Sequence, residues 1–258
     1  MSEPFCLVIP AYNEAATIKT VIHQALTYVS TVIVVNDASD DATANMVRQT
    51  PAVLLEHPEN AGKARALQTG FQYALAKGFE RVITLDGDGQ HDPASIPLLN
   101  QAFDRFPEHF VIAARLTNRE NAPRARQIAN KIADFWVGWA AGTPIADSQS
   151  GFRLYPASLL RQLDLDRHGP SGFVFESEVL IHAAQKGYDL VFVPIASCYP
   201  EVRRASHFRP GFDISHITLM VAGKLIRKGL FLPGLVKSVL RHPRIYTPKP
   251  SSSGHRLP

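Results

Sequence analysis

The chain has 258 residues and a mass of 28.4 kDa, which is enough for a large domain whose core needs no disulfide or metal. Hydrophobic residues make up 45% and charged residues 19% of it, which excludes an intrinsically disordered protein. Cys6 and Cys198 are far apart in apolar surroundings, so we expect free thiols in a reducing compartment and no zinc site. No apolar stretch reaches the ~18 residues of a transmembrane helix, and no signal peptide is expected.

The net charge of +4 is unevenly distributed along the chain. Residues 201–258 carry eleven basic and two acidic residues, a local balance of +9, which leaves −5 for the first 200 residues. The chain is therefore not a uniformly basic protein of the kind that binds nucleic acid. We expect the basic end to meet an anionic membrane surface.

Short apolar runs alternate with helical patterns over the first 115 residues. The runs are continuous, as in strands covered on both faces, and predict strands at 5–10, 31–36, 52–57, 81–86 and 110–115. Helices are predicted between them, at 14–28, 40–49, 62–77 and 94–105, the first with Asn13 as its N-cap. This order predicts an α/β fold with a mostly parallel sheet and helices on both sides, whose ligands bind at the carboxyl ends of the strands.

The pattern is less regular after residue 115. It predicts helices at about 124–140, 175–187 and 213–229 and a strand at 190–195, and it assigns no element to 147–156. We expect one domain over 1–230, with halves at about 1–115 and 116–230. A basic tail over 231–258 follows, and its low-complexity end is expected to be disordered.

A cluster of oxygen ligands follows the predicted strand 81–86. Asp86 and Asp88 flank Gly87, and Gln90 comes two residues later. Carboxylates this close repel one another unless a cation lies between them, and carboxylate and amide oxygens suit Mg²⁺ or Mn²⁺. The spacing therefore predicts a divalent metal site that would also hold substrate phosphates.

Competing nucleotide-binding motifs are absent from the sequence. There is no GxGxxG after the first strand and no complete P-loop, which argues against a dinucleotide-dependent dehydrogenase and a P-loop enzyme. Lys63 opens a predicted helix after Gly62, where it could meet a phosphate or be an ordinary solvated lysine.

Five ordered motifs make the sequence resemble the family 2 glycosyltransferases of GT-A fold, in particular the dolichol- and polyprenol-phosphate sugar transferases. They are VIPAYNE (8–14), VNDASDD (35–41), NAGKARAL (60–67), LDGDGQHDP (85–93) and DSQSGFRLY (147–155). Further similarity at 175–195 and 206–210 extends the resemblance over residues 4 to 230. It implies a Rossmann-like donor-binding half before residue 115 and an acceptor-binding half after it.

The resemblance also implies roles for individual residues. The nucleotide-sugar would be bound by Pro10, Tyr12, Glu14, Asp37, Lys63, Asp86 and Gly87. The metal, Mg²⁺ or Mn²⁺, would be held by Asp86, Asp88 and Gln90, would bridge the diphosphate and would stabilise the leaving nucleoside diphosphate.

The acceptor side depends on arginines and on one aspartate. The resemblance implies that Arg115 and Arg126 bind the phosphate of a lipid acceptor and take part in catalysis, and Arg153 is a further candidate for that phosphate. Asp147 is the third predicted catalytic residue. It would be the general base if the acceptor were a hydroxyl, or it could form a structural pair with Arg153.

The leading hypothesis is an inverting, metal-dependent transferase that moves a sugar from a nucleotide-diphosphate-sugar to a polyprenyl phosphate. It would lie at the cytoplasmic face of the membrane, attached peripherally through the basic amphipathic segment 214–240. The alternatives are a saccharide or other hydroxyl acceptor, a nucleotidyltransferase, and a nucleotide-binding module without transferase activity.

Overall fold

The computed structural model describes residues 5–117, 124–163, 172–196, 210–227 and 229–248, except for the side chains of 125–126, 172–174, 210–217 and 227. Seven strands form one sheet in the order β3-β2-β1-β4-β6-β5-β7. Their bounds are β1 Phe5–Ala11, β2 Val32–Asn36, β3 Val53–Glu56, β4 Arg81–Thr84, β5 Phe110–Thr117, β6 Arg153–Pro156 and β7 Leu190–Ala196. All neighbours are parallel except β6, which is antiparallel to both β4 and β5.

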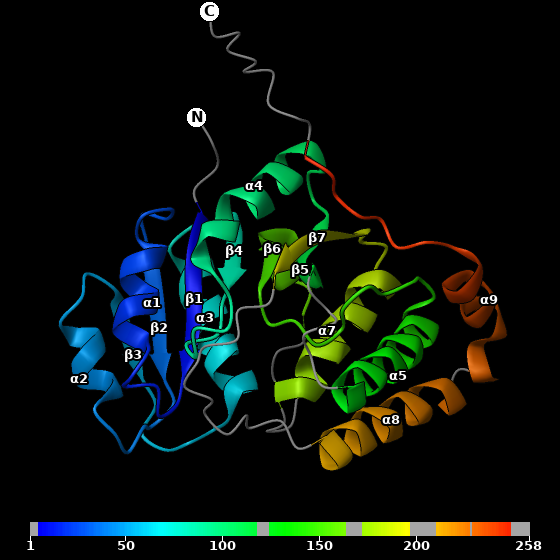
Figure 1. Ribbon diagram of the computed structural model, residues 1–258, viewed down its shortest axis with the longest axis horizontal. Coiled ribbons are helices and arrows are strands. Elements are labelled where there is room, and N and C mark those ends of the chain that lie inside the picture. Colours follow the sequence, from blue (N-terminus) through cyan, green and yellow to red (C-terminus); the bar gives the residue numbers. More distant parts are fainter. Residues whose placement is uncertain (1–4, 118–123, 164–171, 197–209, 228, 249–258) are drawn as a thin grey trace, which may run out of the picture.

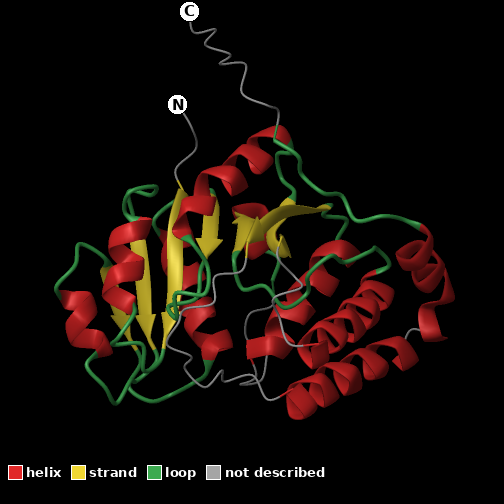
Figure 2. Ribbon diagram, viewed as in Figure 1, coloured by secondary structure: helices red, strands yellow, loops and turns green. Residues whose placement is uncertain are grey.

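Helices cover both faces of this sheet, as Figures 1 and 2 show. The α-helices are α1 Ile18–Ala25, α2 Thr43–Arg48, α3 Lys63–Ala76, α4 Ile96–Arg105, α5 Arg124–Ala141, α6 Ala157–Leu160, α7 Gly172–Gln185, α8 Pro210–Arg227 and α9 Leu232–Leu240. Short 3-10 turns, η1 Pro93–Ser95 and η4 Gly229–Phe231, precede α4 and α9. The predicted mostly parallel sheet between two helical layers is confirmed.

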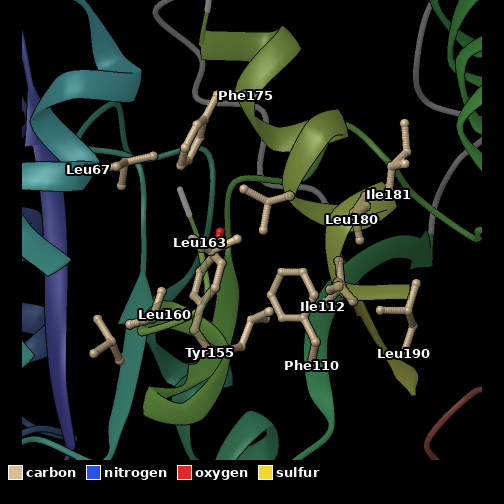
Figure 3. Packing of buried hydrophobic residues seen from close by; sticks show 14 of the residues in the cluster. Leu67, Phe110, Ile112, Tyr155, Leu160, Leu163, Phe175, Leu180, Ile181 and Leu190 are labelled. Carbon is tan, nitrogen blue, oxygen red and sulfur yellow. The ribbon is translucent and has the colours of Figure 1, made fainter. Parts of the chain in front are cut away.

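Two hydrophobic cores lie on opposite faces of the sheet. β1, β2 and β4 are buried almost throughout, so their side chains feed both cores, as the continuous apolar runs predict. The core under α3 and α7 is rich in aromatic residues, and the Tyr155 ring lies 4.6 Å from Phe110 and 5.0 Å from Phe71 between centroids (Figure 3). Cys6 is free and buried in this core, and burial raises the pKa of its thiol to about 12. Cys198 lies outside the described residues.

The amino-terminal part of the fold differs from the prediction at one helix start. Asn13 is not an N-cap, because its backbone is left-handed (φ 58°) and its side-chain oxygen accepts the N–H of Asp40 at 2.9 Å. The side chain thus links the loop after β1 to the loop after β2. The α1 helix is recorded from Ile18, whose N–H donates to the carbonyl of Glu14 at 2.9 Å.

The carboxyl-terminal part contains an element that the prediction did not separate. The expected helix at 213–229 ends where Leu230 and Phe231 take positive φ angles (66° and 41°), and α9 then begins at Leu232. After α9 the chain returns to the sheet edge, where Tyr246 is buried and its N–H donates to the carbonyl of Phe192 at 2.8 Å. At least part of the expected tail is thus folded.

Candidate active site

The predicted site residues converge on one edge of the sheet. The residues that follow β1, β2, β4 and β5 lie there because parallel strands end at the same edge. Strand β6 runs the opposite way, so the residues that precede it, 147–151, reach the same edge. This reversal brings Asp147 to the strand ends that carry Asp86 and Arg115.

A lysine between two carboxylates lies at the centre of the site. Lys63, the first residue of α3, places its Nζ 2.6 Å from Asp86 Oδ1 and 2.7 Å from Glu176 Oε1. Burial alone would lower the pKa of Lys63, but the two negative charges outweigh it and raise that pKa far above its usual range. Burial alone would raise the pKa of Asp86, but the charge of Lys63 outweighs it and lowers the pKa. Lys63 and Asp86 are therefore both held in their charged forms at neutral pH.

Gly151 leaves room for the carboxylates of Asp86 and Glu176 to approach each other around Lys63. A Cβ at this position would lie 2.7 Å from Asp86 Oδ2, closer than side chains normally approach, and 3.0 Å from Glu176 Oε1, which is also an unusually tight contact. Thr84, at the end of β4, holds the loop by donating its hydroxyl to the carbonyl of Gly151 at 2.6 Å. The glycine of the SGFR segment is thus needed for close approach to the carboxylates.

The loop after β4 presents the expected metal ligands. Asp88 accepts the N–H of Gln90 at 2.9 Å, and the carbonyl of Gly87 accepts the hydroxyl of Thr17 at 2.7 Å. Burial, and then the neighbouring charge of Asp86, raises the pKa of Asp88. A divalent cation would remove this repulsion, so the donor set fits Mg²⁺ or Mn²⁺.

The protein supplies few ligands for such a cation. In the described part of the chain, no three His, Cys, Asp or Glu side chains gather in a way that could hold a metal ion. Glu176 Oε2 is buried without a hydrogen-bond partner among the described residues, but its Oε1 is bound to Lys63. Asp86 and Asp88 would therefore need the amide of Gln90, water or substrate oxygens to complete the coordination.

Asp37 has a supporting place in the donor half. Its carboxylate accepts the N–H groups of Ala61 (2.9 Å) and Gly62 (2.7 Å) and lies 2.7 Å from Nδ1 of His57. The side chain is thus buried against the turn that leads to Lys63, where Gly62 has a φ of 87°. Asp37 orders the start of α3.

The other predicted donor residues follow β1. Pro10 is buried within the strand, opposite Val35 of β2, and Tyr12 is half-exposed with its hydroxyl 3.4 Å from Asp40 Oδ2. Glu14 is buried, and its N–H donates to Thr43 Oγ1 at 2.7 Å. The loops after β1 and β2 therefore form one hydrogen-bonded rim beside Asp86.

On the acceptor side, Arg115 and Asp147 form an ion pair that is held by two side-chain hydrogen bonds. The Nε and Nη2 of Arg115 donate to Asp147 Oδ2 (2.8 Å) and Oδ1 (2.9 Å). The carboxylate also accepts the N–H groups of Arg115 (3.0 Å) and Gln149 (3.1 Å). Burial alone would raise the pKa of Asp147, but Arg115 and these hydrogen bonds hold it far below its usual range. Asp147 is therefore a poor general base, and its partner is Arg115 rather than Arg153.

The geometry does not support an acceptor-binding role for Arg153. Its side chain is fully buried and donates to the carbonyl oxygens of Ser148, Ser150 and Glu176 at 3.0, 2.7 and 2.8 Å. The guanidinium ties the loop 148–150 to α7 inside the protein. The side chain of Arg126 lies outside the described residues, so its predicted role stays a prediction.

Two buried residues of the site were not predicted. Glu176 lies in the region of further similarity at 175–195, but no spacing in the sequence connects it with Lys63, 113 positions away. His91 is 5% exposed, burial lowers its pKa to about 4, and its ring lies 5.7 Å from that of Phe152 between centroids. The packing of α7 brings Glu176 to the site, whereas His91 lies in the loop after β4 and its burial appears only in the folded chain.

Comparisons with known proteins agree with this geometry. Residues 6–163 match the family described as Glycosyl transferase family 2. The chain is similar to the UDP-N-acetylglucosamine–dolichyl-phosphate N-acetylglucosaminyltransferase of Methanococcus voltae, with 28% identity over 85% of this chain and 97% of that protein. It is also 28% identical to the undecaprenyl-phosphate mannosyltransferase of Micrococcus luteus, over 73% of this chain and 81% of that protein.

Solved structures share the fold. Mannosyl-3-phosphoglycerate synthase from Rubrobacter xylanophilus has a TM-score of 0.68 and 16% identity, over 88% of this chain and 75% of that chain. Glucosyl-3-phosphoglycerate synthase from Mycobacterium tuberculosis, in complex with UDP, has a TM-score of 0.66 and 21% identity, over 89% and 81%. At these identities the likeness concerns the fold alone, and it confirms the expected GT-A architecture.

Proposed function

Since the chain belongs to glycosyl transferase family 2, and is therefore a glycosyltransferase, we propose that it moves a sugar from a nucleotide-diphosphate-sugar to a polyprenyl phosphate. The reaction would be a direct displacement with inversion at the anomeric carbon. Relatives named as transferases to dolichyl phosphate and to undecaprenyl phosphate support this acceptor class. In this chain, the proposal rests above all on the Arg115–Asp147 ion pair.

The ion pair favours an acceptor that is already anionic. A hydroxyl acceptor needs a base to remove its proton, whereas a phosphate at neutral pH does not. Asp147 accepts four hydrogen bonds and has a pKa far below neutrality, so it has little tendency to take a proton. The cationic side of the pair, Arg115, suits a phosphate, together with Arg126 if that side chain reaches the site.

The donor side would hold the diphosphate through cations. A bound Mg²⁺ or Mn²⁺ would stabilise the charge of the leaving nucleoside diphosphate, and Asp86, Asp88 and Gln90 would hold it. The solved glucosyl-3-phosphoglycerate synthase includes complexes with UDP and either Mn²⁺ or Mg²⁺. Lys63 would add a second positive charge at the same diphosphate.

The nucleoside would lie on the rim formed by the loops after β1 and β2. Tyr12 and Glu14 would line it, with Gly87 beside them and Pro10 beneath as part of the strand. Asp37 would act by shaping the Ala61–Gly62 turn, since its carboxylate is occupied there. The enzyme would work at the cytoplasmic face of a membrane, where a lipid phosphate is available. None of the described helices is long and apolar enough to cross that membrane.

Product analysis tests the proposal directly. The protein is incubated with Mn²⁺, a mixed pool of nucleotide-sugars and detergent-solubilised undecaprenyl phosphate, and the lipid fraction is examined by mass spectrometry. We expect one lipid-linked sugar, nucleoside diphosphate in equal amount, and loss of both on chelation with EDTA. Transfer only to soluble saccharides would overturn the lipid-phosphate acceptor, and nucleotide binding without turnover would overturn the transferase reaction.

A further inference from the structure

Exposed apolar side chains are concentrated at one end of the molecule. Ten of the twelve large apolar residues exposed in the described part of the chain belong to α5, α8 and the segment Gly229–Leu240. Figure 1 shows these helices together, on the side of the molecule away from β1–β3. Such clustering differs from the scattered exposure that is normal for a protein surface.

Two of these helices, α5 and α9, pack against each other and carry seven of the ten residues, which together we call the α5–α9 face. It consists of Ile128, Ile132, Phe135, Leu232, Val236, Val239 and Leu240. In α9 these residues recur at helical spacing and are 54–76% exposed. The helix is docked on the carboxyl-terminal end of α5, where Trp139 Nε1 donates to the carbonyl of Leu230 at 3.0 Å. Ile128 and Ile132, in the amino-terminal half of α5, are exposed.

Positive charges border this face. Arg124 and Lys131 on α5, and Lys237 and Arg241 at α9, are exposed. Residues 229–248 contain no aspartate or glutamate. An apolar helix face bordered by lysine and arginine matches a bilayer with anionic headgroups, in which the apolar side chains enter the acyl boundary.

A cavity of about 390 Å³ lies between α5, the loop 144–146 and the segment 238–245, which begins in α9. Phe135 and Ile245 line it together with Pro144, Ile145 and Pro243, while Lys131, Asp134 and Ser238 supply its polar groups. Its walls also include Leu116 and Ala146, the neighbours in sequence of Arg115 and Asp147. The cavity therefore adjoins the backbone segments that carry Arg115 and Asp147, although neither of these residues lines it.

We propose that the α5–α9 face lies on an anionic lipid bilayer and that the cavity receives one apolar lipid chain from it. A second copy of this chain is disfavoured as the occupant, because pairing two such faces would bring their basic borders together without any acidic residue of 229–248 to offset them. The surface claim stands independently of the reaction. The cavity claim rests on the proposed lipid-phosphate acceptor, because its walls adjoin Arg115 and Asp147.

Vesicle co-sedimentation tests the surface. We expect the full chain to bind vesicles of phosphatidylcholine with 30% phosphatidylglycerol, and to be released by high salt. Val236→Glu should weaken this binding about tenfold or more, and Lys237→Ala about fivefold. Tyr28→Glu, at an exposed aromatic residue beyond the end of α1, is the matched control and should bind like the wild type. Circular dichroism verifies that each variant is folded.

The possible outcomes distinguish a failure of the proposed lipid surface from a failure of the proposed reaction. Equal binding to neutral and anionic vesicles, or no binding to either, would overturn the α5–α9 face as a lipid surface. Light scattering that reports a dimer broken by Val236→Glu would identify a second copy as the occupant. Product formation in detergent without vesicle binding leaves the proposed function intact, whereas binding without any lipid-linked product leaves the surface intact.

The cavity is tested by filling it. Ser238→Leu adds apolar volume at its wall and should leave vesicle binding within about twofold of the wild type. The same variant should raise the KM for a long-chain polyprenyl phosphate at least about fivefold while leaving that for the donor unchanged. An unchanged acceptor KM in a folded variant would overturn the cavity as the chain site.

Discussion

At the scale of single residues, the site is a set of charges that neutralise one another. Lys63 lies between Asp86 and Glu176, and Arg115 is bound at two points to Asp147. A buried ion pair contributes little compared with an apolar pair, but the loss of one partner leaves the other charge uncompensated. Substitutions at these residues should therefore affect stability as well as activity.

Asp147→Asn should destabilise the protein at neutral pH by about 3 kcal/mol, because Arg115 loses its counter-charge. The folded-state pKa of Asp147 is lowered, so the ionised pair stabilises the protein above the unfolded-state pKa. That contribution is lost as the pH falls toward the folded-state pKa. Urea unfolding at pH 7 and at lower pH measures both effects, and the difference between variant and wild type should shrink on acidification.

Asp104→Asn is the matched control for this experiment. Asp104 also pairs with an arginine, Arg81, at 2.6 Å, but its side chain is 58% exposed. Its substitution should cost less than about 1 kcal/mol. Equal effects of the two substitutions would contradict the assignment of Asp147 to a buried, stabilising pair.

Glu176→Gln should lower kcat/KM about 10- to 100-fold, since Glu176 positions Lys63 rather than touching the substrate. In the double variant with Lys63→Ala the loss should be far less than additive, because both changes remove the same contact. The rate of donor turnover, measured for the wild type, both single variants and the double variant, tests this positioning role. Glu178→Gln, which alters a more exposed pair with Lys224, should leave kcat/KM unchanged.

At the scale of elements, the close packing of α3 against β1 helps to fix the position of Lys63, the first residue of α3. A Cβ on Gly70 of α3 would lie 2.3 Å from Val8 Cγ1 of β1. Because α3 begins at Lys63, a shift of this helix would also move the lysine relative to Asp86.

Gly70→Ala should therefore lower the free energy of unfolding by about 1–3 kcal/mol through overpacking. Gly223→Ala provides the control on α8, where nothing beyond the adjoining backbone of the helix itself lies within 4 Å of the added Cβ. There the better helix propensity of alanine should stabilise the protein by up to about 1 kcal/mol. Thermal unfolding of the two variants should show shifts of opposite sign, and shifts of the same sign would contradict the packing argument.

Elements with a strong local signal could be predicted from the sequence. The apolar runs of β1, β2 and β4 and the ligand spacing after β4 need no tertiary information. The β6 strand could not be predicted, because its sequence RLYP contains no continuous apolar run and its place between β4 and β5 depends on non-local pairing. For the same reason, the approach of Asp147 to Arg115 and of Glu176 to Lys63 appears only in the folded chain. The separation of α8 from α9 depends on positive φ angles at Leu230 and Phe231, residue types for which these angles are uncommon.

At the scale of the whole molecule, the segment 241–248 runs from α9 back to the sheet and packs beside β7. The N–H of Phe192 donates to the carbonyl of Arg244 at 2.9 Å, and Tyr246 is buried in the core beside the sheet. Residues 241–248 thus connect α9 with the β7 edge. This segment contributes to the packing of the acceptor half.

Deletion of 232–258 should lower the free energy of unfolding by more than about 3 kcal/mol, because Tyr246 and the contact of α9 with α5 are lost together. Deletion of 249–258 alone is the control and should change it by less than about 0.5 kcal/mol. Urea unfolding of both truncated proteins provides the comparison. Similar stability of the two would contradict a structural role for 232–248.

The reversed strand β6 has a geometric consequence for the group that is transferred. Strands β4 and β5 lie two inter-strand spacings apart, about 10 Å, whereas direct neighbours would be about 5 Å apart. Asp86 follows the first of these strands and Arg115 lies near the end of the second, so the strand order contributes to the distance between donor and acceptor charges. We expect substitutions of side chains at the site to change which sugar is accepted. The strand order would thus fix the spacing within which the transferred sugar must fit.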